Sequence, residues 1–461
     1  MSTLSPHTAR PVESSPALRF RRHLTETLRL GLPVTFARTG MLVMVMFDTA
    51  MTGHFGGGEL AFYALAHATT MVLLLAGVGM MTGTAILVAQ SRGARQEHEC
   101  GVIWRVACLH ALLFGTLSAV FCAFGGALLP LLGQSRDLSD GAAEAMYMLG
   151  LGLPAQLVFV ATSLLLEAIG RPRVGLVLMI LANAVNAGLN WLLIYGEAGL
   201  PAMGAEGAAL ATTIARWLMA FAIVGYVFWF VDGARYNVRG ALSDGWQIGR
   251  KFRALGYPLG LAQALESFAF ASLTFFAGLI GAEAVAAFQI VMNAVALCYM
   301  MAIGLATATA VRVGEAVGRR DSGDTALAGW SGLTAIAAIM TLLGLIMALF
   351  PEAIAAVFSD DTRLHAIVVP TLLVAAITLL PDGAQGVLMG ALRGTGDAWV
   401  PMVLHLCSFT VVMVPAAWLF ALGLGLGTPG LMLGTLCGTA VATVLLGVRF
   451  RRVSKRTINR L

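Results

Sequence analysis

Long runs of apolar residues alternate with short polar stretches along almost the whole chain of 461 residues. A helix needs about 20 predominantly apolar residues to cross a bilayer, and twelve runs of roughly that length or longer follow one another. Each run therefore predicts a transmembrane helix. The runs cover residues 28–52, 61–91, 101–132, 142–168, 173–196, 204–231, 254–280, 284–313, 328–350, 364–391, 399–424 and 429–448.

The composition agrees with this pattern. The chain is 58% hydrophobic and 11% charged, whereas about a quarter of the residues of a soluble domain are charged. We therefore predict an all-α integral membrane protein that is surrounded by the lipid bilayer, its main partner. The six cysteines lie mostly within apolar runs and form no C-x-x-C pair, so the sequence predicts neither a disulfide framework nor a zinc site.

Basic residues are distributed unevenly between the two sides of this predicted bundle. One side has only Arg136 and Arg363, and the other collects the remaining groups of loop and terminal cations. These are in the tail 1–27, at Arg92, Arg95, Arg171 and Arg173, in the linker 232–253, at Arg319, Arg320 and Arg393, and in the tail 451–461. By the positive-inside rule we expect the rich side, with both termini, to be cytosolic in the cell's inner (plasma) membrane. This placement explains the net charge of +5 without a nucleic-acid partner.

An internal repeat divides the chain at the linker 232–253. A shift of 225 positions without a gap aligns Leu30-Gly31-x-Pro33 with Leu255-Gly256-x-Pro258, Gly79 with Gly304, Gly93 with Gly318 and Arg95 with Arg320. The repeat predicts two lobes, residues 28–231 and 254–450, each with six helices. A shift by six helices preserves orientation, so the lobes are parallel repeats, as in transporters that alternate access between two sides.

Three acidic residues stand inside apolar runs, namely Asp48, Glu266 and Asp382. An ionised side chain at the centre of a bilayer costs on the order of 2.5–3.5 kcal/mol, so such acids usually face a cavity and function there. Asp48 could instead be a solvated acid near a helix end, and Glu266 and Asp382 could have structural roles. We expect the three acids to be sites for a coupling cation or proton.

Other polar residues share helix faces with these acids or lie on neighbouring helices. In the first half they are Asn183, Asn186, Asn190 and Thr212, and in the second half Gln263, Gln289, Asn293, Gln385 and His405. Residues three or four apart on a helix lie on one face, so these side chains are candidates to line a cavity. The alternative is that the amides hold helices together by hydrogen bonds and that the histidine is packed. Arg38 and Arg216 are also embedded, and the sequence does not say which acids they face.

Several longer motifs occur together along nearly the whole chain. They are Leu30-Gly31-Leu32-Pro33 with Asp48-Thr49-Ala50-Met51-Thr52-Gly53, Leu87-Val88-Ala89-Gln90-Ser91-Arg92-Gly93, Glu167-Ala168-Ile169-Gly170-Arg171-Pro172, Ala286-Ala287-Phe288-Gln289-Ile290, Val311-Arg312-Val313-Gly314 and Gly390-Ala391-Leu392-Arg393-Gly394-Thr395-Gly396-Asp397. In these stretches the chain resembles the multidrug and toxic compound extrusion (MATE) family, NorM-like branch. The resemblance implies two lobes in a V and export of small, mostly cationic amphipathic molecules in exchange for Na⁺ or H⁺.

The resemblance also implies functional residues. Asp48, Asn186, Asn190 and Thr212 match the family's amino-terminal cation site, and Glu266 with Asp382 matches the carboxy-terminal acid pair of the NorM-like branch. A Na⁺ ion would then be held at Glu266 and Asp382 or at Asp48, Asn186 and Asn190. We expect no cofactor apart from this coupling ion, and we expect the chain to function as a monomer.

Three other functions compete with this interpretation. A lipid-linked sugar flippase of the same superfamily would be expected to have fourteen helices and a basic cavity, which the embedded acids disfavour. A membrane-embedded enzyme is disfavoured because the chain has no G-x-S-x-G with a partner histidine, no H-E-x-x-H and no P-loop. A passive channel gains little support from a repeat of two lobes.

Overall fold

The computed structural model describes residues 16–55, 57–131, 136–199, 201–240, 245–358 and 362–455, and the regular structure of these residues is entirely helical. Twelve helical stretches among them are long and apolar enough to cross a membrane, which confirms the predicted number. Residues 1–15 and 456–461 of the predicted tails and residues 241–244 of the linker lie outside the described residues.

The first lobe runs from α1 to α8. Its elements are α1 (Pro16–Phe55), α2 (Gly57–Gly93), α3 (Glu99–Ala123), α4 (Gly125–Leu131), α5 (Arg136–Leu151), α6 (Leu153–Ala168), α7 (Arg173–Tyr195), the 3₁₀-helix η1 (Glu197–Gly199) and α8 (Gly204–Phe230). A single predicted span, the fourth, consists of α5 and α6, which meet at Gly152.

The second lobe follows the short linker helix α9 (Gly233–Tyr236). It contains α10 (Gly245–Ile280), α11 (Ala282–Gly318), α12 (Ser322–Leu349), α13 (Pro351–Phe358), α14 (Thr362–Gly394), α15 (Trp399–Cys407), the π-helix η2 (Ser408–Met413), α16 (Val414–Trp418), the π-helix η3 (Leu419–Gly423) and α17 (Thr428–Ser454). The eleventh span is the continuous stretch from α15 to η3.

Several helices begin earlier than the apolar pattern predicts, and the differences are largest for α1 and α10. α1 begins at Pro16 and α10 at Gly245, so the described end of the predicted linker is already helical. Hydropathy marks only the part of a helix that contacts lipid, and polar residues can extend a helix into water beyond it. In α1 this polar extension is anchored, because Glu26 forms an ion pair with Arg312 of α11.

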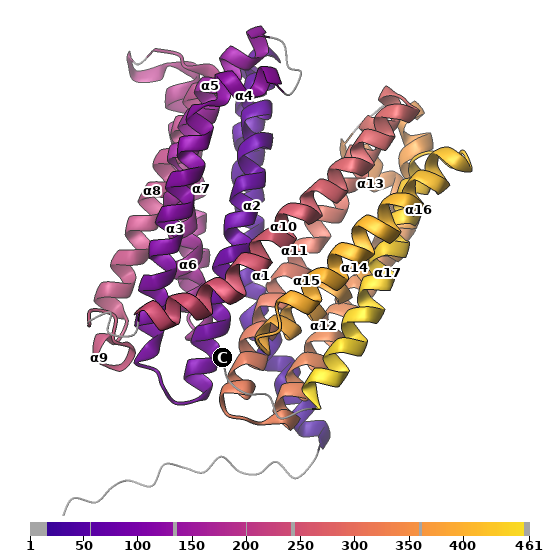
Figure 1. The fold of residues 1–461 in the computed structure, drawn as a ribbon. Helices are drawn as coiled ribbons and strands as arrows, with labels where there is room; N and C mark the ends of the chain where they lie inside the picture. The colour runs from indigo at the N-terminus through magenta and orange to yellow at the C-terminus, as the bar shows by residue number, and fades with distance from the viewer. Residues whose placement is uncertain are drawn as a thin grey trace, which may run out of the picture.

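The two lobes meet at one end of the molecule and diverge toward the other, as Figure 1 shows. Both described chain ends lie at the end where the lobes meet. There α1 packs against α11 and α10 packs against α2, so equivalent helices of the two repeats exchange contacts between lobes. This arrangement confirms the predicted V of two parallel repeats.

The backbone itself repeats at equivalent positions. Arg95 and Arg320, which are 225 residues apart, both have left-handed φ angles, of 60° and 59°. Non-glycine residues adopt this conformation infrequently, so its occurrence at both positions supports a common origin of the two loops. Large apolar side chains such as Phe221, Trp229 and Leu117 are exposed on the outer surface of the first lobe, as expected of a surface that contacts lipid.

Candidate functional site

The carboxylate of Asp48 is fully buried in the first lobe and accepts hydrogen bonds from three other helices. Asn190 Nδ2 of α7 donates to Oδ1 at 2.7 Å, Thr212 Oγ1 of α8 donates to Oδ2 at 2.6 Å, and Tyr63 Oη of α2 donates to Oδ2 at 2.8 Å. Three donors around two oxygens suit an ionised carboxylate, which only accepts hydrogen bonds. These hydrogen bonds offset part of the desolvation cost of the buried acid.

The asparagines of α7 have two different sets of hydrogen-bond partners. Asn186 lies in the Asp48 cluster, because its Nδ2 donates to Thr212 Oγ1 at 3.2 Å and its Oδ1 accepts from Asn190 Nδ2 at 3.3 Å. Asn183 Nδ2 donates instead to the backbone oxygens of Gly40 and Met179, at 3.1 and 2.8 Å. Asn183 therefore joins α7 to α1, and it is not among the residues that line the central cavity.

In the second lobe, Glu266 of α10 has weaker partners. Gln263 Nε2, one turn earlier, donates to Oε2 at 3.3 Å, and His405 Nε2 of α15 lies 3.5 Å from the same oxygen. The imidazole of His405 also stacks on Phe409, with ring centroids 4.2 Å apart. The histidine is thus both packed, as one reading of the sequence held, and close to the acid.

Asp382 of α14 is buried beside this group. Gln385 Nε2 donates to its Oδ1 at 3.4 Å, and Asp382 and Glu266 are close enough for their charges to interact. Tyr299 of α11 lies against the residue after Gln385, because its hydroxyl would be 3.3 Å from a Cβ atom built on Gly386. The remaining two predicted polar residues do not join the site: Gln289 Nε2 donates to Asn293 Oδ1 at 3.3 Å on the exposed surface of α11.

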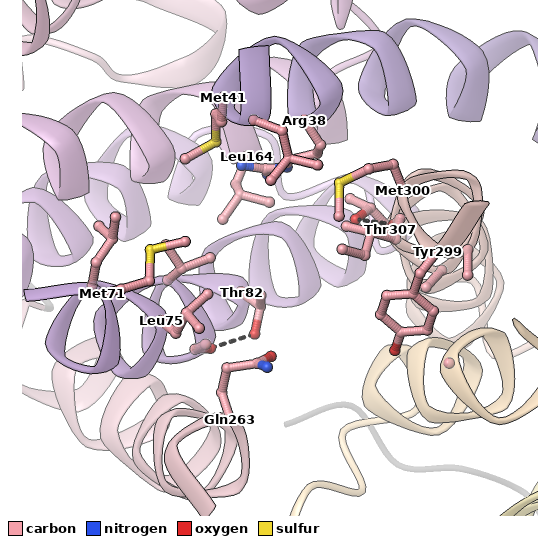
Figure 2. Close-up of a pocket in the computed structure, with 18 of the residues that line it drawn as sticks. Arg38, Met41, Met71, Leu75, Thr82, Leu164, Gln263, Tyr299, Met300 and Thr307 are labelled. Carbon is pink, nitrogen blue, oxygen red and sulfur yellow. Dashed lines mark hydrogen bonds between the residues drawn. The ribbon is translucent and has the colours of Figure 1, made fainter. Parts of the chain in front are cut away.

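Both acid sites open on one cavity between the lobes, with a volume of about 260 Å³. Figure 2 shows Arg38, Met41 and Met71 from the first lobe and Tyr299, Met300 and Thr307 of α11 around it, with Gln263 nearby. Asp48 lines the cavity on the side of the first lobe and Glu266 on the side of the second, whereas Asp382 lies behind the wall. A molecule in this cavity therefore contacts residues of both repeats.

The wall of the cavity is apolar, with a few charged groups. The methionines that line it are Met41, Met44, Met71, Met179, Met219, Met300 and Met389. Their thioethers are flexible and polarizable, which suits ligands of varied shape. On α1, Met41 and Met44 line the cavity, whereas Met46 is not among the lining residues and is exposed.

Three arginines also line the cavity, and each interacts electrostatically with an acid. Arg38 Nη2 lies 3.7 Å from Glu167 Oε1, the charge of Arg216 interacts with that of Asp48, and the charge of Arg393 interacts with that of Glu266. The embedded arginines of the sequence thus gain partners. Arg393, which the charge pattern assigned to a cytosolic loop, stands in the last turn of α14 and lines the cavity.

Tyr63, Glu167 and Tyr299 are site residues that the sequence pattern did not single out. Each contacts its partner across two helices, and spacing along one helix carries no signal for such a contact. A buried tyrosine usually finds a hydrogen-bond partner, but the sequence does not show which tyrosines are buried. Among the described residues, no group of three or more histidine, cysteine, aspartate or glutamate side chains could hold a metal ion.

Comparisons with known proteins agree with this architecture. The sequence profile of a family described as MatE matches residues 33–192 and 258–419, one segment in each lobe. The probable multidrug resistance protein NorM of Caulobacter vibrioides is 35% identical over 435 residues, covering 94% of this chain and 92% of that protein. The protein of the same name from Bradyrhizobium diazoefficiens is 31% identical, covering 98% of each chain.

Solved structures give the same fold at lower identity. The eukaryotic MATE transporter AtDTX14 superimposes with a TM-score of 0.86 at 20% identity, over 95% of this chain and 98% of that chain. A MOP superfamily transporter from Pyrococcus furiosus also gives a TM-score of 0.86, at 21% identity, over 96% of this chain and 99% of that chain. Because the family profile covers both lobes and the curated relatives extend over nearly the full chain, this protein belongs to the MATE family of membrane transporters.

Proposed function

We propose that this protein is a secondary active exporter of small amphipathic cations, driven by exchange for Na⁺ or H⁺. The observation that carries the proposal is a cavity between the two repeats, with the carboxylates of Asp48 and Glu266 in opposite parts of its wall. The names of the relatives, which refer to multidrug resistance, support export of more than one compound.

The charges at the cavity favour a cationic ligand. The acids at or behind its wall are Asp48, Glu167, Glu266 and Asp382, and the arginines are Arg38, Arg216 and Arg393. With neutral histidines, four carboxylates against three guanidinium groups leave one negative charge in excess. A cation, either the substrate or the coupling ion, neutralises this excess, and the two compete for it. Such competition is the physical basis of exchange.

The driving force is sufficient for concentrative export. Inward movement of one positive charge down a potential of 100 mV releases about 2.3 kcal/mol, equivalent to roughly a fifty-fold concentration ratio of a neutral solute. Asp48 and the Glu266–Asp382 pair are the groups that we assign to the coupling cation. Asn186, Asn190 and Thr212 position Asp48, and Gln263, Gln385 and His405 position the second pair.

Efflux from proteoliposomes tests the proposal. Imposed Na⁺ and H⁺ gradients are applied separately, and a panel of organic cations with matched neutral and anionic analogues is measured. Concentrative cation export that collapses when the gradient is dissipated is the expected result, and the gradient that drives it identifies the ion. Gradient-independent flux, or preference for a lipid-linked sugar, would overturn the proposal.

We further propose that both termini and the linker 232–253 face the cytosol of a bacterial plasma membrane and that the monomer is the transporting unit. The distribution of lysine and arginine supports the orientation. A cysteine introduced at Gly240 should resist an impermeant reagent applied to intact cells. Labelling from outside would reverse the orientation.

A further inference from the structure

The ends of α2 and α11 cross where the two lobes meet, and their contact has approximate two-fold symmetry. A Cβ atom built on Gly93 of α2 would lie 2.1 Å from the backbone oxygen of Glu315 in α11. A Cβ atom built on Gly318 of α11 would lie 2.1 Å from the backbone oxygen of Gln90 in α2. Adding 225 converts 93 to 318 and 90 to 315, so each repeat contributes the same pair of positions. The two glycines allow the backbones to touch.

Charged and polar side chains bridge the lobes at the same crossing. Arg92 Nη1 lies 2.7 Å from Glu315 Oε1, and the same guanidinium donates to the backbone oxygen of Ala168 in its own lobe. Gln90 Nε2 donates to the backbone oxygen of Gly394, at the end of α14 in the second lobe, at 3.2 Å. Arg92 is thus anchored in the first lobe and reaches into the second.

We propose that the Arg92–Glu315 ion pair is a latch that holds the lobes together at this end and breaks when the cavity opens to that side. This inference rests on the proposed function, because only a carrier that alternates access needs the closed end to separate. The lobes touch by backbone at Gly93 and Gly318, so they cannot move apart there without separating Arg92 from Glu315.

The exposure of the pair suits a contact that forms and breaks repeatedly. The side chains of Arg92 and Glu315 are 24% and 28% exposed, so water can solvate each charge as the helices separate. A fully buried pair would leave uncompensated charges in the protein when broken, which would make opening far more costly. The latch therefore biases the equilibrium between the two conformations without locking it.

The second lobe contains a matched control. Arg449 Nε of α17 lies 2.8 Å from Asp397 Oδ2, just after α14, with side chains 34% and 15% exposed. This ion pair has similar geometry, but both partners belong to one lobe. Removing it should not change how far the lobes stand apart.

The test measures the distance between the lobes by electron spin resonance in the full chain reconstituted in lipid. The six native cysteines are replaced, and labels are attached at two exposed positions, His98→Cys in the α2–α3 loop and Ser322→Cys at the first residue of α12. Glu315→Gln and Arg92→Gln should each raise the population with the longer distance severalfold, Arg92→Lys should raise it less, and Asp397→Asn should leave it unchanged. Distance distributions that do not respond to Glu315→Gln and Arg92→Gln, or respond equally to Asp397→Asn, would overturn the latch.

A steric variant provides a second, independent measurement. Gly93→Ala should shift the same distribution, because its methyl group meets the backbone of Glu315. Gly188→Ala on α7, where an added Cβ meets nothing within 4 Å, is its control. Efflux measured in the same vesicles distinguishes the latch from the proposed transport function. A distance change without ion-driven export would refute the proposed function and retain the latch, whereas export with an unresponsive distance would refute the latch alone.

Discussion

The acid sites of the two lobes are built differently although the lobes are repeats. Asp48 in the first lobe is a single carboxylate whose donors come from three other helices at 2.6 to 2.8 Å. Glu266 and Asp382 in the second lobe are two carboxylates, each with an amide donor from its own helix at 3.3 to 3.4 Å. The first site is tightly coordinated, and the second is looser and carries more charge.

This difference indicates how the two sites respond to a cation. Short hydrogen bonds to an ionised group are strong, so a proton or ion that binds Asp48 must displace donors from α2, α7 or α8 and will shift those helices. The longer contacts of Glu266 and Asp382 leave acceptor capacity for a ligand without such displacement. The first site is thereby suited to couple binding to helix movement, and the second to receive the ligand.

The largest effect should come from removing the carboxylate of Asp48 in the first lobe. Asp48→Asn cannot bind a proton or a cation, so gradient-driven efflux should be abolished, a loss of up to about fifty-fold in accumulation for each coupled charge at 100 mV. Thr49→Val, at the neighbouring exposed residue, is the control and should transport normally. Unchanged efflux by Asp48→Asn would remove the first site from the mechanism.

Next in size should be the effects in the second lobe. Glu266→Gln and Asp382→Asn should each reduce accumulation to nearly that of vesicles without a gradient, because we expect two carboxylates whose charges interact to function as one site. The double variant should be little worse than either single one, since residues that act as a unit are not additive. Losses that multiply independently would show that the acids work separately.

The fold was more predictable from the sequence than the sites were. Twelve spans and the repeat follow from hydropathy and from matches such as Gly93 with Gly318, because bilayer thickness and duplication leave their mark along the chain. The helical spacing of Asn186 and Asn190 predicted one polar stripe that faces a cavity with Asp48, and the family resemblance implied the same grouping. Tyr63 could not be placed near Asp48, because the two residues lie on different helices and the spacing of residues along one helix does not predict a contact between α1 and α2. Arg393 was assigned to a loop because the apolar run ends at residue 391, although the structure shows that Arg393 lines the cavity.

A smaller effect should distinguish the tyrosines of the two sites. Tyr63→Phe removes a hydrogen bond to the charged Asp48, for which about 1.5–3 kcal/mol is typical, so efflux should fall roughly tenfold. Tyr299→Phe removes a neutral polar group from the cavity wall, and a hydrogen bond between neutral groups typically contributes about 0.5–1.5 kcal/mol, so the loss should be about threefold. Initial rates in proteoliposomes measure both. A greater loss for Tyr299→Phe would reverse the contrast between a tight and a loose site.

The smallest effect should come from an acid outside the membrane, which is a comparison for the membrane-embedded acids Asp48 and Glu266. Glu97 in the α2–α3 loop forms an ion pair with Arg235 of α9, and the hydrogen bond from Arg235 lowers the pKa of Glu97 below its ordinary value of 4.5. The ion pair therefore stabilises the folded protein fully at pH values above the ordinary pKa of Glu97. This stabilisation is lost as the pH falls through the lowered pKa of the folded state. Exposed pairs contribute about 0.2–1 kcal/mol, so Glu97→Gln should lower thermal stability slightly at pH 7, have no effect in strong acid, and leave efflux unchanged. Thermal unfolding in detergent at both pH values, with efflux at pH 7, measures these effects. Loss of efflux in Glu97→Gln would mean that the loop, and not only the cavity, takes part in coupling.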